Sequence, residues 1–89
     1  MGPSRSAYRS ELEELWRVRL EQAAKLHKAA SIEFRKALDD MREGRTVPPD
    51  GSFALRKAGL EESAAIQEHT RVLRIFVDLT VYRKIPPEE

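Results

Sequence analysis

The segment at residues 44–52, which reads Gly-Arg-Thr-Val-Pro-Pro-Asp-Gly-Ser, is the feature that most constrains the fold of this chain. Pro48 and Pro49 cannot continue a helix, and a proline also biases the residue before it toward extended geometry. Gly44 suits the left-handed backbone position at which helices commonly end. We therefore predict an all-α chain with a first helix over about residues 6–44, a Pro/Gly loop over 45–51 and a second helix over about 52–84.

The sequence on both sides of this break has a helical period, because apolar residues recur at steps of three and four. At 1.5 Å rise per residue the two helices would be about 55–60 Å and about 45–50 Å long. Isolated helices are marginal in water, so we expect these two to fold back on each other as an antiparallel hairpin. The hairpin would form a single domain over 1–89, with flexible tails at 1–5 and 86–89.

Small residues at heptad spacing predict how the two helices align. Three alanines lie seven residues apart before the break, and a second series with the same spacing follows it. Folding the chain about the break pairs Ala23 with Val72, Ala30 with Ala65, and Ala37 with Ala58. Small residues that face one another at this spacing let two helices approach closely.

The segment from Val72 to Tyr82, which reads VLRIFVDLTVY, is too apolar for a two-helix hairpin to cover. At about 100° per residue its apolar side chains span roughly 260° of the helix circumference. Exposed patches of this kind mark interfaces, so we predict a homodimer that forms a four-helix bundle, or a different protein bound at the same surface. The predicted interface comprises Tyr8, Leu12, Trp16, Leu73, Phe76, Val77, Thr80 and Val81. A β-strand is the alternative for this segment because it is rich in β-branched residues, although its alternation is poor.

Composition excludes several classes of protein. The chain has no cysteine, which removes disulfides and thiolate metal sites. Sixteen basic residues balance fifteen acidic ones, so no global field attracts nucleic acid or anionic lipid. No apolar run approaches the roughly 20 residues of a membrane span, and no stretch resembles a signal peptide. We therefore expect a cytoplasmic protein with no nucleic-acid or membrane partner.

His27 and His69 are the only histidines, and the alanine alignment places them at nearly the same level. Glu62 lies seven residues before His69 on the same stripe, so these three residues are the candidate ligands of a metal or small molecule inside a bundle. Two observations weigh against that site: neither histidine follows a glutamate by three residues, and Glu62 lies about 10 Å from His69 along the axis. The histidines could instead be half-buried core residues that set the alignment, or part of a pH-linked interface.

Arg19 falls within the core stripe of the first helix, where we expect it to follow the bundle edge, stack on Trp16 or pair with Asp78. The sequence carries no catalytic triad and no P-loop lysine spacing, and it implies no cofactor. We therefore predict a non-enzymatic interaction or structural module that acts as a homodimer. The alternative is a bundle that binds a metal or small ligand through the two histidines and Glu62.

Overall fold

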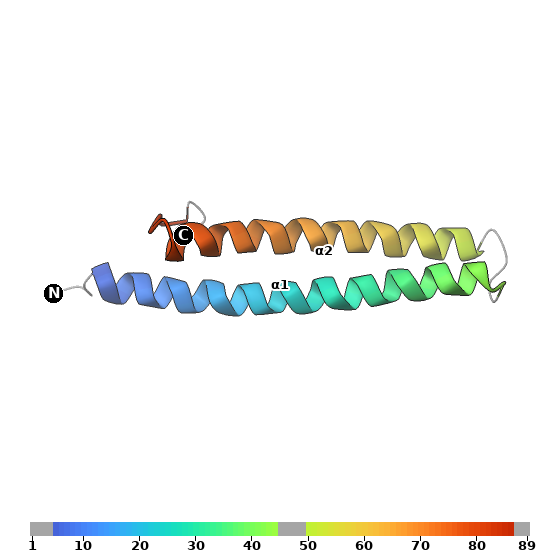
Figure 1. The fold of residues 1–89 in the computed structure, drawn as a ribbon, viewed down its shortest axis with the longest axis horizontal. Coiled ribbons are helices and arrows are strands. Elements are labelled where there is room, and N and C mark those ends of the chain that lie inside the picture. Colours follow the sequence, from blue (N-terminus) through green and yellow to red (C-terminus); the bar gives the residue numbers. More distant parts are fainter. Residues whose placement is uncertain (1–4, 45–49, 87–89) are drawn as a thin grey trace.

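The computed structural model describes residues 5–44 and 50–86, and within these ranges the chain forms two helices and no strand. Helix α1 runs over Arg5–Arg42 and helix α2 over Asp50–Thr80. The helices pack side by side in antiparallel directions along a rod of 65 × 21 × 17 Å (Figure 1). The predicted all-α hairpin is therefore confirmed. Residues 45–49 of the predicted loop and residues 1–4 and 87–89 of the predicted tails lie outside the described residues. The rest of these predictions is wrong, because α2 begins at Asp50 within the predicted loop, Arg5 belongs to α1 and Pro86 is buried.

Helix α1 ends as the sequence predicts. Gly44 has a φ of 71°, and its backbone N–H donates to the carbonyl of Met41 at 3.3 Å. The N–H of Glu43 donates to the carbonyl of Asp39 at 2.9 Å, which continues the helical pattern one residue beyond the assigned end. Glycine reaches positive φ without the Cβ clash that other residues meet, so it can turn the chain out of the helix here.

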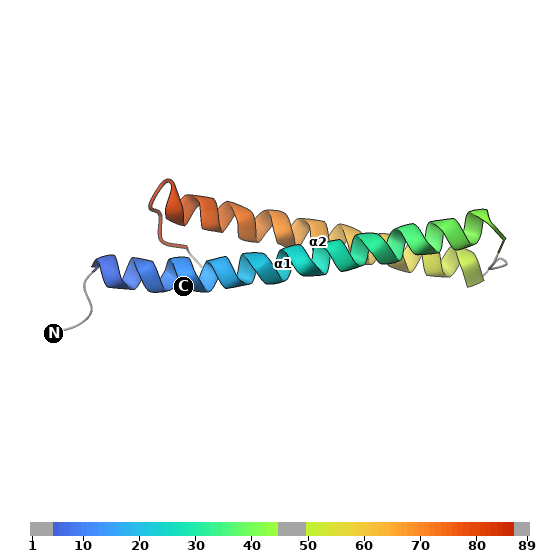
Figure 2. The ribbon, with the colours of Figure 1, turned by 60° about the horizontal axis from the view of Figure 1, so that its bottom comes forward.

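Helix α2 ends at Thr80, which is earlier than the predicted end near residue 84. Arg83 adopts a left-handed φ of 57°, and the N–H of Lys84 reaches back to the carbonyl of Asp78 at 2.8 Å. The segment after the helix then turns back toward α1 (Figure 2), and Pro86 is buried. Burial of this proline, together with the extended geometry that a proline favours in the residue before it, ends the helix before Pro86 is reached.

The core of the hairpin lies between the two helices. Its buried cluster comprises Leu12, Trp16, Ala23, Val72 and Leu79, with Leu20, Ile75 and Phe76 packed against it. All of these residues belong to the half of the hairpin that is remote from the connection between the helices, which we call the open half. In the other half, the loop half, Ala58 is the buried hydrophobic residue.

The alanine alignment is confirmed at all three predicted levels. Ala23 and Val72 lie in the same buried cluster. Ala30 and Ala65 line one shallow groove between the helices, and Ala37 and Ala58 line another nearer the loop. The strand alternative for VLRIFVDLTVY is wrong, because α2 continues through this segment to Thr80.

Candidate functional site

One long side of the hairpin carries a strip of mostly uncharged side chains next to the seam between the helices. Helical geometry at 100° per residue, counted from Ala23 and Val72 at the seam, places one flank of each helix on this side. Two contacts across the seam confirm the placement: His27 meets His69, and a Cβ added at Gly59 would lie 3.3 Å from the Cε2 atom of Phe34. We call this surface the histidine face. It comprises Leu20, Ala24, His27, Ser31, Phe34 and Leu38 of α1, and Leu55, Gly59, Glu62, Ile66, His69, Leu73, Phe76, Val77 and Thr80 of α2.

The side chains of the histidine face are neither buried nor fully exposed. Most are half-buried against the neighbouring helix, while Ile66 and Leu73 are 40% and 44% exposed. Glu62 is the charged member of this set, and the same helical geometry places Arg17, Lys28 and Arg35 of α1 along its outer edge. The face is therefore a largely apolar strip along both helices, with charged side chains at its α1 edge.

The opposite side of the hairpin has a different character. It carries shallow grooves floored by alanines and edged by charged side chains, such as Glu61 and Glu68 around Ala30 and Ala65. Toward the loop the edge is formed by Glu33, Lys36, Asp40 and Lys57, and toward the open end by Arg19 and Arg71. This alanine face combines charged side chains with exposed apolar ones, among them Leu26, which is 64% exposed beside Ala30 and Ala65.

The histidine pair lies near the middle of the histidine face. The Nδ1 atoms of His27 and His69 are 2.9 Å apart, the ring centroids are 5.2 Å apart and the ring planes make an angle of 66°. Each Nδ1 atom lies about 1.1 Å from the centre of its own ring. The distance between the ring centroids is therefore close to its largest possible value for this Nδ1–Nδ1 distance, which requires both nitrogens to lie on the line that joins the two ring centres. The two Nδ1 atoms therefore point almost directly at each other, which is the geometry of a hydrogen bond that holds one proton.

This geometry bears on the metal hypothesis. Two imidazoles that share an ion direct their lone pairs at a common point about 2.0–2.1 Å from each nitrogen, not at each other. Glu62 lies two helical turns from His69, about 10 Å along the axis. Within residues 5–44 and 50–86, no group of three or more His, Cys, Asp or Glu side chains is placed to hold an ion. The structure thus brings together two of the three predicted ligands as a hydrogen-bonded pair, with Glu62 apart from them.

The predicted interface residues fall into three groups. Leu12 and Trp16 are buried within the single hairpin, so they support the surface from inside and offer little area to a partner. Leu73, Phe76, Val77 and Thr80 lie on the histidine face. Tyr8 and Val81 are exposed outside it, with Val81 beyond the end of α2.

Sequence reasoning missed the part of the histidine face that lies toward the loop. Phe34, Leu38, Leu55 and Ile66 belong to this part. The signal was present as heptad spacing, because Leu20, His27 and Phe34 lie seven residues apart, as do Leu55, Glu62, His69 and Phe76. The Val72–Tyr82 segment has the higher density of apolar residues, so the sequence-based prediction was restricted to it and left out the heptad series toward the loop.

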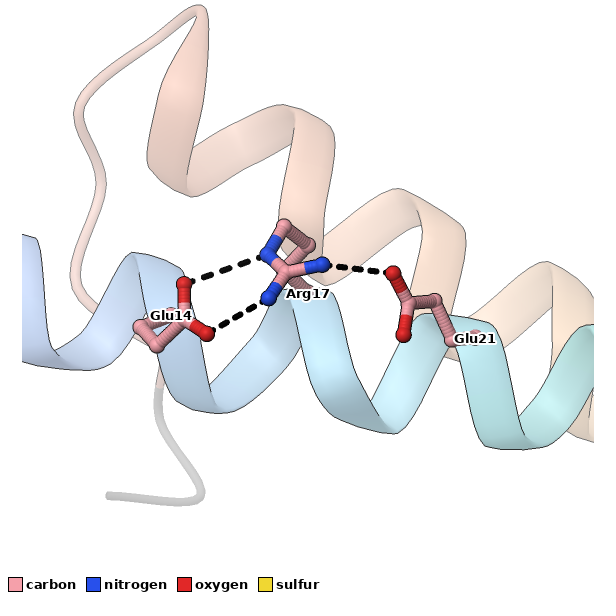
Figure 3. A network of polar contacts seen from close by, with 3 residues as sticks. All are labelled: Glu14, Arg17 and Glu21. Atoms are coloured by element: carbon pink, nitrogen blue, oxygen red, sulfur yellow. Dashed lines mark hydrogen bonds and ion pairs between the residues drawn. The ribbon is translucent and has the colours of Figure 1, made fainter.

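Two cationic side chains near the open end have defined contacts. The guanidinium carbon of Arg19 lies 4.4 Å from the centroid of the Trp16 ring, so of the alternatives that the sequence left open for this residue the structure shows stacking on Trp16. Arg17 bridges Glu14 and Glu21 on the outer surface of α1, with two hydrogen bonds to Glu14 at 3.1 and 2.5 Å and one to Glu21 at 2.5 Å (Figure 3). These hydrogen bonds, assisted by charge attraction, lower the pKa of Glu14 below its ordinary value and raise that of Arg17.

Neither of the two described helices is long and apolar enough to cross a membrane. Comparison with protein families, with curated protein sequences and with solved structures finds no match to this chain. The class that the fold defines is a long antiparallel helical hairpin. The features of the hairpin that bear on its function are its two faces and the histidine pair.

Proposed function

We propose that this protein is a non-enzymatic interaction and structural module that acts as a homodimer, in which two hairpins pack through their histidine faces into a four-helix bundle. The observation that carries the proposal is the strip of half-buried apolar side chains along the histidine face, with Ile66 and Leu73 40% and 44% exposed. Apolar strips of this kind mark interaction surfaces.

The thin core of the hairpin supports this proposal. The buried hydrophobic residues of the described chain are Leu12, Trp16, Ala23, Ala58, Val72 and Leu79, and three of the six are alanine or valine. A chain of this size with no disulfide needs stabilisation from elsewhere, and oligomerisation is a common source. Packing two histidine faces together would bury Ile66, Leu73 and the half-exposed residues around them.

A second copy of the chain is the occupant that fits the face best. A dimer with twofold symmetry uses the same patch on both subunits, so the patch must tolerate contact with itself. The histidine face meets this condition because it carries one charge, Glu62, and that charge lies away from the middle of the face. The face also extends on both sides of the His27–His69 level, so a twofold axis near this level would cover most of it.

The test compares two leucines of α2. Leu73 is 44% exposed on the histidine face, and Leu60 is 64% exposed on the opposite side. Light scattering of the wild-type protein should give twice the monomer mass. Leu73→Glu should shift the mass toward the monomer while circular dichroism reports whether the helices persist, whereas Leu60→Glu should leave the mass unchanged.

Two outcomes would overturn the proposal. A well-folded wild-type monomer at micromolar concentration would remove the homodimer. An equal response to Leu73→Glu and Leu60→Glu would show that the association does not use the histidine face. A monomer that forms a stable complex only when mixed with a different protein would show that the histidine face binds a heterologous partner.

A further inference from the structure

We infer that dimerisation of this protein is controlled by pH through the His27–His69 pair, with the dimer favoured when the pair is neutral and weakened when it takes up protons. This inference rests on the proposed homodimer, because it concerns what the histidine face does once a second copy covers it.

The hydrogen bond between the two histidines depends on how many protons the pair carries. A hydrogen bond between two Nδ1 atoms at 2.9 Å needs one hydrogen between them. In the neutral pair one ring carries its proton on Nδ1 and the other on Nε2, so the bond forms. A first added proton, placed on an outer Nε2 atom, leaves this bond intact and makes it charge-assisted. A second added proton puts a hydrogen on both Nδ1 atoms, so the bond is lost and two positive rings face each other.

The surroundings of the pair offer little compensation for that charge. On α1 the residues one turn from His27 along the seam and the face are Ala23, Ala24, Ala30 and Ser31, which carry no charge. On α2 the corresponding neighbours of His69 are Ala65, Ile66, Val72 and Leu73, which are also neutral.

The charged residues nearest in sequence lie elsewhere. Lys28 follows His27 on the exposed surface of α1. Glu68 precedes His69, but its carboxylate binds the Arg71 guanidinium at 2.6 and 2.9 Å. Glu62 shares the histidine face and lies about 10 Å away along the axis, too far for a direct hydrogen bond. A second copy would add only the same set of residues.

The direction of the pH effect follows from this environment. In the free hairpin the half-buried rings have access to water, which solvates an imidazolium. In a dimer with its twofold axis near this level the partner removes that water, and burial disfavours the charged form. Dissociation therefore takes up protons, so dimer affinity is highest at neutral pH and falls as the solution is acidified.

The experiment is a measurement of the dimer dissociation constant by sedimentation or light scattering at pH 7.5 and pH 5.5. For the wild-type protein we expect the constant to rise at least about tenfold over this range, because both hairpins take up protons. The variant His27→Gln/His69→Gln keeps side chains of similar size that do not titrate, so its constant should change by less than about twofold. Glu11→Gln removes an exposed carboxylate outside the histidine face, so it serves as the control and should keep the wild-type pH dependence.

A second measurement keeps the inference testable if the double variant does not fold. Nitrogen chemical shifts of the two imidazoles in the wild-type protein should show one ring protonated on Nδ1 and the other on Nε2 near neutral pH. Two rings with the same tautomer, each carrying its proton on Nε2, would exclude the shared proton and overturn the inference.

The failures of the two proposals are distinguishable. A wild-type protein that is monomeric at both pH values contradicts the proposed homodimer. A dimer whose affinity is independent of pH contradicts the histidine switch while the homodimer stands. A pH dependence that persists unchanged in His27→Gln/His69→Gln assigns the effect to other groups and also overturns the inference.

Discussion

The open half and the loop half of this hairpin have the same backbone but different interiors. In the open half Trp16 is 1% exposed and Leu79 is fully buried, within a cluster that also includes Leu12 and Val72. In the loop half Ala58 is the buried hydrophobic residue, and Phe34 is half-buried beside Gly59. The difference indicates that the hairpin is packed more tightly at its open end than at its loop end.

The open half also carries a cost. The Nε1 atom of Trp16 and the Nε atom of Arg9 are buried without a hydrogen-bond partner among the described residues. An unsatisfied buried polar group of this kind costs about 1–3 kcal/mol. The apolar burial of the indole ring must exceed this cost, which makes Trp16 the residue whose truncation tests the comparison most severely.

Trp16→Ala should therefore have the largest effect. Loss of a fully buried tryptophan costs about 3–5 kcal/mol, because it removes apolar contacts and leaves a cavity. Phe34→Ala, the matched aromatic truncation in the loop half, should cost about 1–2 kcal/mol since its ring is only half-buried. Urea unfolding at a fixed protein concentration measures both values. Equal losses at the two sites would show that the two halves contribute alike.

Leu79→Ala should follow, with a loss of about 2–5 kcal/mol for a fully buried leucine. Leu60→Ala is the control on the same helix, and its expected effect lies within about 0.5 kcal/mol because that side chain is largely exposed. Thermal unfolding of the three proteins gives the order directly. A large loss of stability in Leu60→Ala would show that Leu60 makes a contact that the isolated hairpin does not contain.

Gly44→Ala sharpens the comparison at the end of α1. With φ at 71°, an alanine here would be held in the left-handed region, which costs about 1–2 kcal/mol for a residue with a Cβ. Gly44→Asn should lose less, because asparagine tolerates this conformation better. The free energy of unfolding of both variants decides the point, and equal stability of Gly44→Ala and wild type would contradict the left-handed end of the helix.

Gly59→Ala is expected to have a smaller effect in the loop half. Alanine is favoured over glycine inside a helix by about 0.5–1 kcal/mol, but the new Cβ would lie 3.3 Å from the Phe34 ring. The ring is half-buried and can shift slightly, so we expect a net gain of less than about 0.5 kcal/mol. In a Phe34→Ala background the gain should approach the full propensity difference, and a double-mutant cycle measures the coupling. No coupling would place Phe34 away from Gly59.

Arg17→Gln should have the smallest effect, because the Glu14–Arg17–Glu21 network is exposed and screened by water. The pKa of Glu14 is lowered by its hydrogen bonds to Arg17, so the contribution of this pair is present above the ordinary carboxyl pKa and is lost as pH falls through the lowered value. Unfolding at pH 7 and pH 3, with and without added salt, separates the variant from wild type only at pH 7 and low salt. A difference that persists at pH 3 would point to packing of the arginine stem.

Much of the architecture could be predicted from the sequence because it follows from local rules. Prolines 48 and 49 and the glycine at 44 exclude a continuous helix, and the helical period on each side requires two helices that cover each other. The alanine series also predicted the alignment, since close approach of two helices is restricted to small residues at heptad spacing. His27 and His69 were placed at one level for the same reason.

The rest depended on distances that spacing along the chain does not contain. After Thr80, Arg83 takes a left-handed φ and the chain turns back toward α1 (Figure 2) with Pro86 buried, which spacing along the chain does not show. The burial of Leu12 and Trp16 inside one hairpin, where the sequence predicted a surface, depends on which neighbours cover them. The sequence by itself determined two helices, their antiparallel pairing and their alignment, because these follow from backbone hydrogen bonding and helical period. Only the tertiary structure decided which residues are buried and that the Nδ1 atoms of the two imidazoles lie 2.9 Å apart, because both depend on side-chain positions across the seam.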